Sequence, residues 1–116
     1  MPNTSLNITY DFGQKEIRIE FETPQQAKAY QGHNPEARIL RAANKSVWLP
    51  VPPQLKSLRS SSRYGIEFCF ANEQAQKEWQ RKTLLAELVI PHGTTRHSVH
   101  LKKEWTQADL NNRLGI

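Results

Sequence analysis

The segment Lys56–Arg63, with the sequence KSLRSSSR, concentrates side chains that bind anions. It holds three cations and four serine hydroxyls. Lysine and arginine attract phosphate oxygens by charge, and serine hydroxyls donate hydrogen bonds to them without reading a base sequence. The segment therefore predicts contact with a polyanion, and a merely solvated basic surface is the alternative.

Further basic residues extend this surface, and Trp48 adds an aromatic ring on which an unpaired base can stack. Trp105 is a second candidate for stacking, whereas Trp79 is expected to pack in the core or at an edge. Because the chain has no helix-turn-helix, RNA-recognition or zinc-finger motif, base-specific reading is not expected. The predicted nucleic-acid-binding residues are Lys56, Arg59, Arg63, Arg81, Lys82, Arg96, Lys102, Lys103 and Trp48.

The charge of the chain is unevenly distributed. Its net charge is +5, but residues 1–36 hold five acids and three bases, whereas residues 37–116 hold six acids and thirteen bases. No acid occurs between Ala37 and Ile66. A one-sided field of this kind favours nucleic acid or an acidic protein surface as the partner.

Three histidines, His92, His97 and His100, come closest to the spacing of a metal site. Such a site needs three or four donors that converge on one point. On a strand, His97 and His100 point to opposite faces, because their spacing of three is odd. We therefore predict surface histidines and no cofactor, and a metal site at these three histidines is the alternative.

Cys69 is the only cysteine, so an internal disulfide is impossible and a reducing cytoplasm is the expected location. Its place between Phe68 and Phe70 predicts a packed, inert thiol. The sequence shows no catalytic-triad signature, phosphate-binding glycine loop or paired-carboxylate motif. It also shows no secretory signal and no apolar run of about 20 residues. We therefore expect a non-enzymatic cytoplasmic protein.

An internal repeat organises these residues. The window Glu16–Gln31, EIRIEFETPQQAKAYQ, aligns without a gap with Gly65–Gln80, GIEFCFANEQAQKEWQ, and five positions are identical. Each window has alternating apolar residues followed by a helix start, which predicts a strand and then a helix. The likeness continues where residues 46–49 (SVWL) match residues 98–101 (SVHL). Repetition of this kind predicts two copies of one structural unit.

The helices are expected to begin at polar caps. Thr23 followed by Pro24 predicts the start of the first helix, and Gly32 is expected to close it. Asn72 and Thr106 are the predicted N-caps of the other two helices. Residues 37–42 and 47–51 are predicted strands with a turn at 43–45, and residues 54–59 are expected to form a helical turn that buries Leu55 and Leu58.

These elements predict an α+β protein of one domain, residues 1–116. It would consist of two strand-helix-strand-strand units, approximately residues 15–59 and 64–114, that form a mostly antiparallel sheet with the helices on one face. The pattern resembles paired-βαβββ small-molecule-binding proteins and ferredoxin-like folds in topology alone. An open sheet leaves edge strands that can recruit a second copy, so a homodimer is expected.

The function predicted from the sequence is that of a nucleic-acid-binding accessory protein that uses its basic surface. One alternative is a protein-binding inhibitor or immunity-type module that docks on an acidic partner. Another alternative is a small-ligand-binding protein with a pocket between the repeats.

Overall fold

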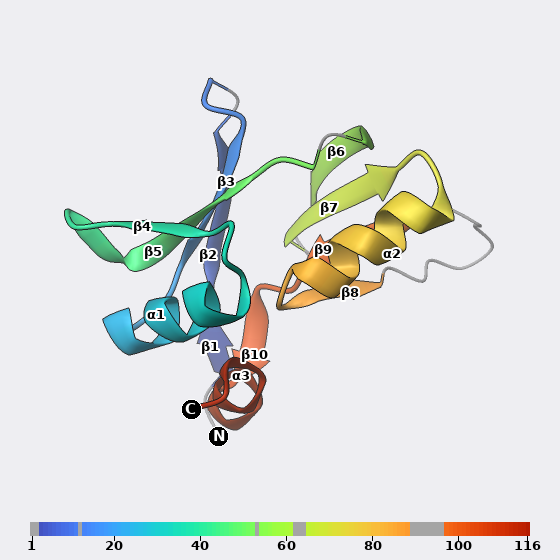
Figure 1. Cartoon of the computed structure of the whole chain (residues 1–116). Coiled ribbons are helices and arrows are strands. Elements are labelled where there is room, and N and C mark those ends of the chain that lie inside the picture. The colour runs from blue at the N-terminus through green and yellow to red at the C-terminus, as the bar shows by residue number, and fades with distance from the viewer. Residues whose placement is uncertain (1–2, 12, 53, 62–64, 89–96) are drawn as a thin grey trace. The chain divides into compact units, whose positions relative to one another are not determined.

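The computed structural model describes the chain except for residues 1–2, 12, 53, 62–64 and 89–96 (Figure 1). Its contacts divide the chain into two compact units. Unit 1 comprises Met1–Val51 and Lys103–Ile116, and unit 2 comprises Pro52–Lys102. The α+β class is confirmed, but the described strands form three small antiparallel sheets rather than the predicted one sheet.

Unit 1 is built on a four-stranded sheet with the order β2-β3-β5-β4. Residues of alternating character in β3 give it one apolar and one polar face, and helix α1 packs on the apolar face (Figure 1). Ile17, Ile19, Val47 and Leu49 are buried there, and the Phe21 ring packs 5.7 Å from that of Tyr30. The elements are β2 (Asn7–Asp11), β3 (Glu16–Glu20), α1 (Pro24–His33), β4 (Arg38–Leu40) and β5 (Ala43–Pro50).

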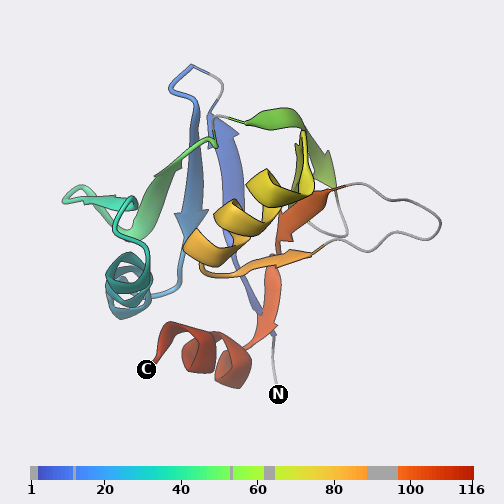
Figure 2. The same ribbon diagram turned by 45° about the vertical axis from the view of Figure 1, so that its right-hand side comes forward.

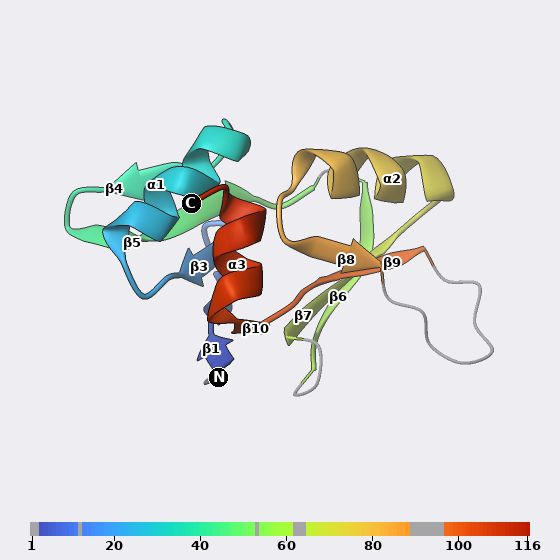
Figure 3. The same ribbon diagram turned by 90° about the horizontal axis from the view of Figure 1, so that it is seen from below.

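The two ends of the chain meet in unit 1. Strand β1 (Asn3–Ser5) pairs with β10 (Glu104–Thr106), and the Leu6 amide donates to the Lys103 carbonyl at 2.6 Å. Helix α3 (Gln107–Leu114) follows β10 and packs against α1, and its Leu110 is fully buried (Figure 3).

None of the helices in the described part of the chain is long and apolar enough to cross a bilayer.

Unit 2 is a second four-stranded sheet with one helix, with the strand order β6-β7-β9-β8. Helix α2 contacts β7, β8 and β9 (Figure 2). Trp79 is half-buried and anchors this contact, because its ring lies 4.7 Å from that of Phe68 and 5.6 Å from that of Phe70. The predicted packing role of this tryptophan is therefore confirmed. The elements are β6 (Leu55–Ser61), β7 (Gly65–Phe70), α2 (Glu73–Lys82), β8 (Ala86–Leu88) and β9 (Ser98–Leu101).

The two four-stranded sheets share one topology and one register. Each runs strand, strand, helix, strand, strand along the chain, and in each the last strand lies between the second and third. Ile17 on β3 pairs with Leu49 on β5, and at the matching place Ile66 on β7 pairs with Leu101 on β9. The residues aligned from the sequence therefore pair identically in the two units.

The three predicted N-caps are confirmed. The Thr23 hydroxyl accepts from the Gln26 amide at 3.2 Å, and the Thr106 hydroxyl accepts from the Asp109 amide at 3.1 Å. The Asn72 carbonyl oxygen accepts from the Ala75 amide at 2.9 Å. These side chains satisfy amide groups that have no acceptor within their own helices.

Three local predictions were wrong. Helix α1 continues through Gly32 to His33 and is capped by Asn34. The turn between β4 and β5 lies at residues 41–42, not at 43–45, because β5 begins at Ala43. Residues 54–59 do not form a helical turn, since β6 occupies residues 55–61.

A β-bulge explains the error at β6. The pairing register with β7 shifts between Leu55 and Ser57, so Leu55 lies opposite Phe70 and Leu58 lies opposite Phe68. Both leucines therefore lie on the face that carries the phenylalanines. A spacing of three in a regular strand would separate them, and the extra residue of the bulge restores them to one face.

Candidate nucleic-acid interface

Trp48 lies on the polar face of the unit 1 sheet, opposite the face that carries Ile17 and Ile19. It pairs with Arg18 of β3 on one side and with Arg38 of β4 on the other. Thr9 of β2 extends the same row, because it pairs with Arg18. The ring is half-buried, so part of it is accessible from this face.

Arg18 lies over the Trp48 ring, with its guanidinium carbon 5.3 Å from the ring centroid. Its Nε donates to the Ser46 hydroxyl at 3.2 Å, and its Nη2 donates to Glu20 Oε2 at 3.0 Å. Cation–π attraction and these hydrogen bonds hold the guanidinium beside the ring.

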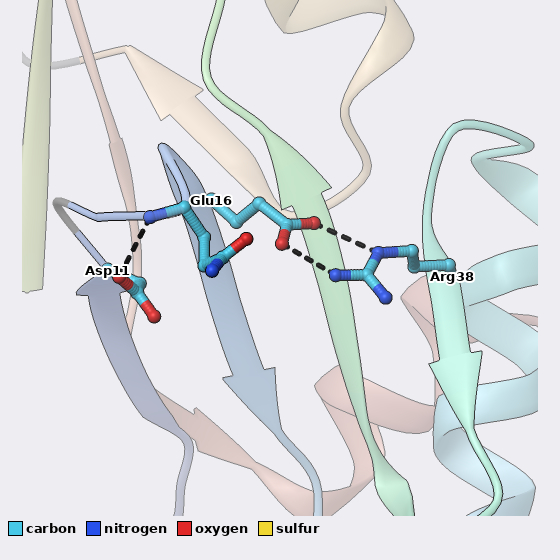
Figure 4. Close-up of polar contacts among 4 residues, drawn as sticks. Asp11, Glu16 and Arg38 are labelled. Carbon is cyan, nitrogen blue, oxygen red and sulfur yellow. Dashed lines mark hydrogen bonds and ion pairs between the residues drawn. The ribbon is translucent and has the colours of Figure 1, made fainter.

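Arg38 lies over the same ring, with its guanidinium carbon 5.9 Å from the centroid. Its Nε and Nη2 donate to the two carboxylate oxygens of Glu16 at 3.0 and 2.6 Å, a bidentate pair that joins β4 to β3 (Figure 4). The hydrogen bond to Glu16 raises the pKa of Arg38 above its ordinary value. The guanidinium therefore stays charged at every physiological pH.

The two ion pairs differ in the solvent exposure of their side chains. The side chains of Arg18 and Glu20 are 40% and 43% exposed, and only one oxygen of Glu20 receives a bond from Arg18. The Arg38 side chain is 50% exposed, but that of Glu16 is only 16% exposed and both of its oxygens are engaged. We call these five residues the Trp48 cluster: Trp48, Arg18, Glu20, Arg38 and Glu16.

The turn between β2 and β3 positions Glu16 at the start of its strand. The Gln14 amide donates to Asp11 Oδ1 at 3.0 Å across this turn (Figure 4), and Lys15 adopts a left-handed conformation with φ 53°. Gly13 and Gln14 therefore lie in a tight turn. The strand that follows carries Glu16, Arg18 and Glu20 on its polar face.

The predicted cations of unit 2 lie on several elements. Lys56 is exposed on β6, and Arg81 and Lys82 are exposed in the last turn of α2. Lys102 follows β9 and is half-buried. Arg59 lies within β6, whereas Arg63 and Arg96 fall outside the described residues.

Two of the predicted nucleic-acid-binding residues belong to unit 1. They are Trp48 and Lys103, which is half-buried. Among the described residues, the cations that lie over the Trp48 ring are Arg18 and Arg38, neither of which was among the predicted contacts. Trp105 on β10 is buried, so its predicted exposed stacking face is wrong.

The histidines do not form a metal site within the described residues, which contain no cluster of three or more metal-ligating side chains. His97 is half-buried and His100 is buried, so the predicted surface position of His100 is wrong. His100 pairs in register with Glu67, which is also buried. His92 lies outside the described residues.

Cys69 is a free, half-buried thiol on the face of β7 opposite Phe68 and Phe70. It pairs in register with Ser98. The Ser98 hydroxyl is fully buried and has no hydrogen-bond partner in the described part of the structure.

The sequence contained one signal for the missed arginines. Glu16, Arg18 and Glu20 alternate with Ile17 and Ile19, which predicts a charged strand face. The partner strand of that face was not predictable, because Arg18 and Trp48 are far apart in the chain and only sheet register brings them together.

Comparison with protein-family models, with curated proteins and with solved structures found no match to this chain.

Proposed function

We propose that this protein is a non-enzymatic nucleic-acid-binding accessory protein that binds an unpaired strand on the Trp48 cluster. The observation that carries the proposal is a half-buried tryptophan flanked by two arginines on the polar face of the unit 1 sheet, opposite the face on which α1 packs. Aromatic rings on such faces stack with unpaired bases, and guanidinium groups add stacking and phosphate contacts.

The ion pairs of the cluster do not prevent binding. Exposed ion pairs are typically worth about 0–1 kcal/mol, whereas stacking a base on an aromatic ring is worth about 1–3 kcal/mol. The stacking of a base can therefore compensate for the ion pair that it opens. The displaced guanidinium stays charged and remains within reach of the bound strand.

The cations of unit 2 supply additional phosphate contacts in this proposal. Lys56, Arg81 and Lys82 are exposed, so within unit 2 their charges are available to the phosphates of a bound strand. Contacts of this kind are independent of sequence and weaken with salt.

Binding of a fluorescent single-stranded oligonucleotide at about 50 mM salt tests the proposal. We expect Trp48→Leu to weaken binding by about 1–3 kcal/mol, and Arg18→Gln to weaken it more than Arg41→Gln. Arg41 is exposed in the turn between β4 and β5, so it is a control of equal charge. Failure to bind any nucleic acid, in a protein shown by circular dichroism to be folded, would contradict the proposal.

We further propose that the two four-stranded sheets arose by duplication of one unit. The shared strand order and the matched pairing of Ile17 with Leu49 and of Ile66 with Leu101 support this origin. Among the described strands, β2, β4, β6 and β8 lie at the edges of their sheets, which favours a homodimer. Sedimentation would test this.

The protein-docking and small-ligand alternatives remain predictions. Co-purification with one stoichiometric protein, in the absence of nucleic acid, would favour docking on an acidic partner.

A further inference from the structure

The Trp48 cluster is electrically balanced, which sets it apart from a simple phosphate-binding site. Two guanidinium groups, Arg18 and Arg38, are matched by two carboxylates, Glu20 and Glu16. A site selected for phosphate alone gains from a net positive charge, and carboxylates repel the anion. A balanced set of donors and acceptors around an aromatic ring is instead suited to the edges of a neutral base.

The cluster has unused hydrogen-bonding capacity. A guanidinium carries five N–H donors, and the described contacts engage two of them in Arg18 and two in Arg38. A carboxylate offers about four lone-pair sites, and the described contact with Arg18 reaches one oxygen of Glu20. The Arg18–Glu20 pair is therefore the more open of the two.

Among the four bases, guanine matches both members of that pair. Its O6 and N7 form an acceptor pair that suits a guanidinium fork. Its N1–H and N2 amino group form a donor pair on the other edge, which suits a carboxylate because a carboxylate only accepts. Adenine lacks the acceptor pair, and cytosine and uracil lack N7.

We infer, on the basis of the proposed function, that the Trp48 cluster is a specific site for an unpaired guanine. The base stacks on Trp48 in place of the Arg18 guanidinium, which then donates to O6 and N7. The departure of Arg18 leaves Glu20 to accept from N1–H and the N2 amino group. Each member of the opened ion pair thus exchanges its partner for one edge of the base.

Arg38 and Glu16 act as positioning residues in this arrangement. Two hydrogen bonds and the covered position of Glu16 keep this pair closed, so Arg38 remains as a fixed cation beside the ring. If both ion pairs opened, no fixed side chain would remain beside the Trp48 ring. If only the Arg18–Glu20 pair opens, space for the base forms on one side of the ring.

Single-stranded pentanucleotides with one central variable base in a uridine background test the inference. We expect guanosine to bind about five- to a hundredfold more tightly than adenosine or uridine at that place. Inosine, which lacks the N2 amino group, tests the contact with Glu20. A 7-deazaguanosine, which lacks N7, tests the contact with Arg18.

Paired substitutions in the protein and in the base identify the contacts. In the wild-type protein, inosine should bind more weakly than guanosine, and in Glu20→Gln this difference should shrink. The 7-deaza substitution should likewise lose its effect in Arg18→Gln. Because Glu16→Gln loosens Arg38 without removing either contact, it should weaken all bases similarly.

Equal binding of all pentanucleotides, together with weaker binding by Trp48→Leu, would overturn the guanine inference and leave the proposed function intact. Absence of binding to any pentanucleotide or longer strand would overturn both. A guanosine preference that is equally large in Glu20→Gln and Arg18→Gln would also overturn the assignment of these contacts.

Discussion

Trp48 on β5 and His100 on β9 occupy the same register position in two sheets of identical strand order. Trp48 lies between Arg18 and Arg38 in its row, whereas His100 lies between Glu67 and Glu87 in its row. The strand order is therefore common to both units, but Trp48 pairs in register with two arginines and His100 with two glutamates. This difference in residue type favours unit 1 for the proposed base-stacking site.

The buried serines Ser46 and Ser98 provide a matched test of this difference, because they hold equivalent places on β5 and β9. Ser46 accepts from Arg18, while the Ser98 hydroxyl has no partner within the described residues. A buried polar group without a partner destabilises the folded state by about 1–3 kcal/mol. We expect Ser98→Ala to be neutral or stabilising and Ser46→Ala to destabilise by about 0.5–1.5 kcal/mol. Urea unfolding measures both, and a larger loss in Ser98→Ala than in Ser46→Ala would contradict the expectation.

Gly32 is expected to be replaceable by alanine with a gain in stability. It lies inside α1, and an added Cβ would meet nothing within 4 Å. Alanine in a helix is favoured over glycine by about 0.5–1 kcal/mol, because glycine loses more backbone entropy on folding. Thermal unfolding of Gly32→Ala should show a higher midpoint than that of the wild type.

Gly115→Ala is the control for this substitution. Gly115 caps α3 in a left-handed backbone conformation with φ 76°, which residues other than glycine rarely adopt. A Cβ added there would lie 3.4 Å from His33 Nε2. We expect this variant to be less stable than the wild type. Equal effects of the two substitutions would show that local conformation does not determine their sign.

The local elements were predictable from the sequence because their signals are local. Thr23 and Asn72 are cap residues next to helical stretches, and Ile17 and Ile19 alternate with charged residues. These patterns fix a strand and a helix start without knowledge of the partner strands. The strand-to-helix unit was therefore found in both halves of the chain.

The candidate site was predictable only through Trp48. Arg18 and Arg38 join it by pairing on neighbouring strands, and register is set by the packing of the opposite, apolar face. The bulge near Lys56 could not be predicted from the sequence for a related reason, since the spacing of Leu55 and Leu58 also fits a helix. Both features depend on tertiary contacts that a single sequence pattern does not contain.

The N-caps of α1 and α2 should contribute similar amounts to the free energy of unfolding. Thr23→Ala and Asn72→Ala each leave a helix amide without its side-chain acceptor, so each should lower the free energy of unfolding by about 0.5–2 kcal/mol. Thr23→Ser and Asn72→Asp retain an acceptor and should recover most of the loss. Chemical denaturation measures all four variants, and alanine variants as stable as the wild type would contradict the role of the caps.

The ion pair between Glu73 and Lys77 gives a pH dependence whose sign follows from the structure. The two side chains lie 3.0 Å apart in α2, and the hydrogen bond from Lys77, followed by its charge, lowers the pKa of Glu73. Because the pKa of Glu73 is lowered in the folded state, the ion pair makes its full contribution to stability at pH values above the ordinary pKa of a glutamate. It is then lost as the pH falls through the lowered value.

A titration followed by NMR of the Glu73 side-chain carboxyl should therefore have a midpoint below that of an unpaired glutamate. In Lys77→Ala the midpoint should return towards the ordinary value, and added salt should reduce the difference because both side chains are exposed. Lys82→Ala removes a charge from the far end of the same helix and should leave the midpoint nearly unchanged. The same midpoint in the wild type and in Lys77→Ala at low salt would show that the pair does not form in solution.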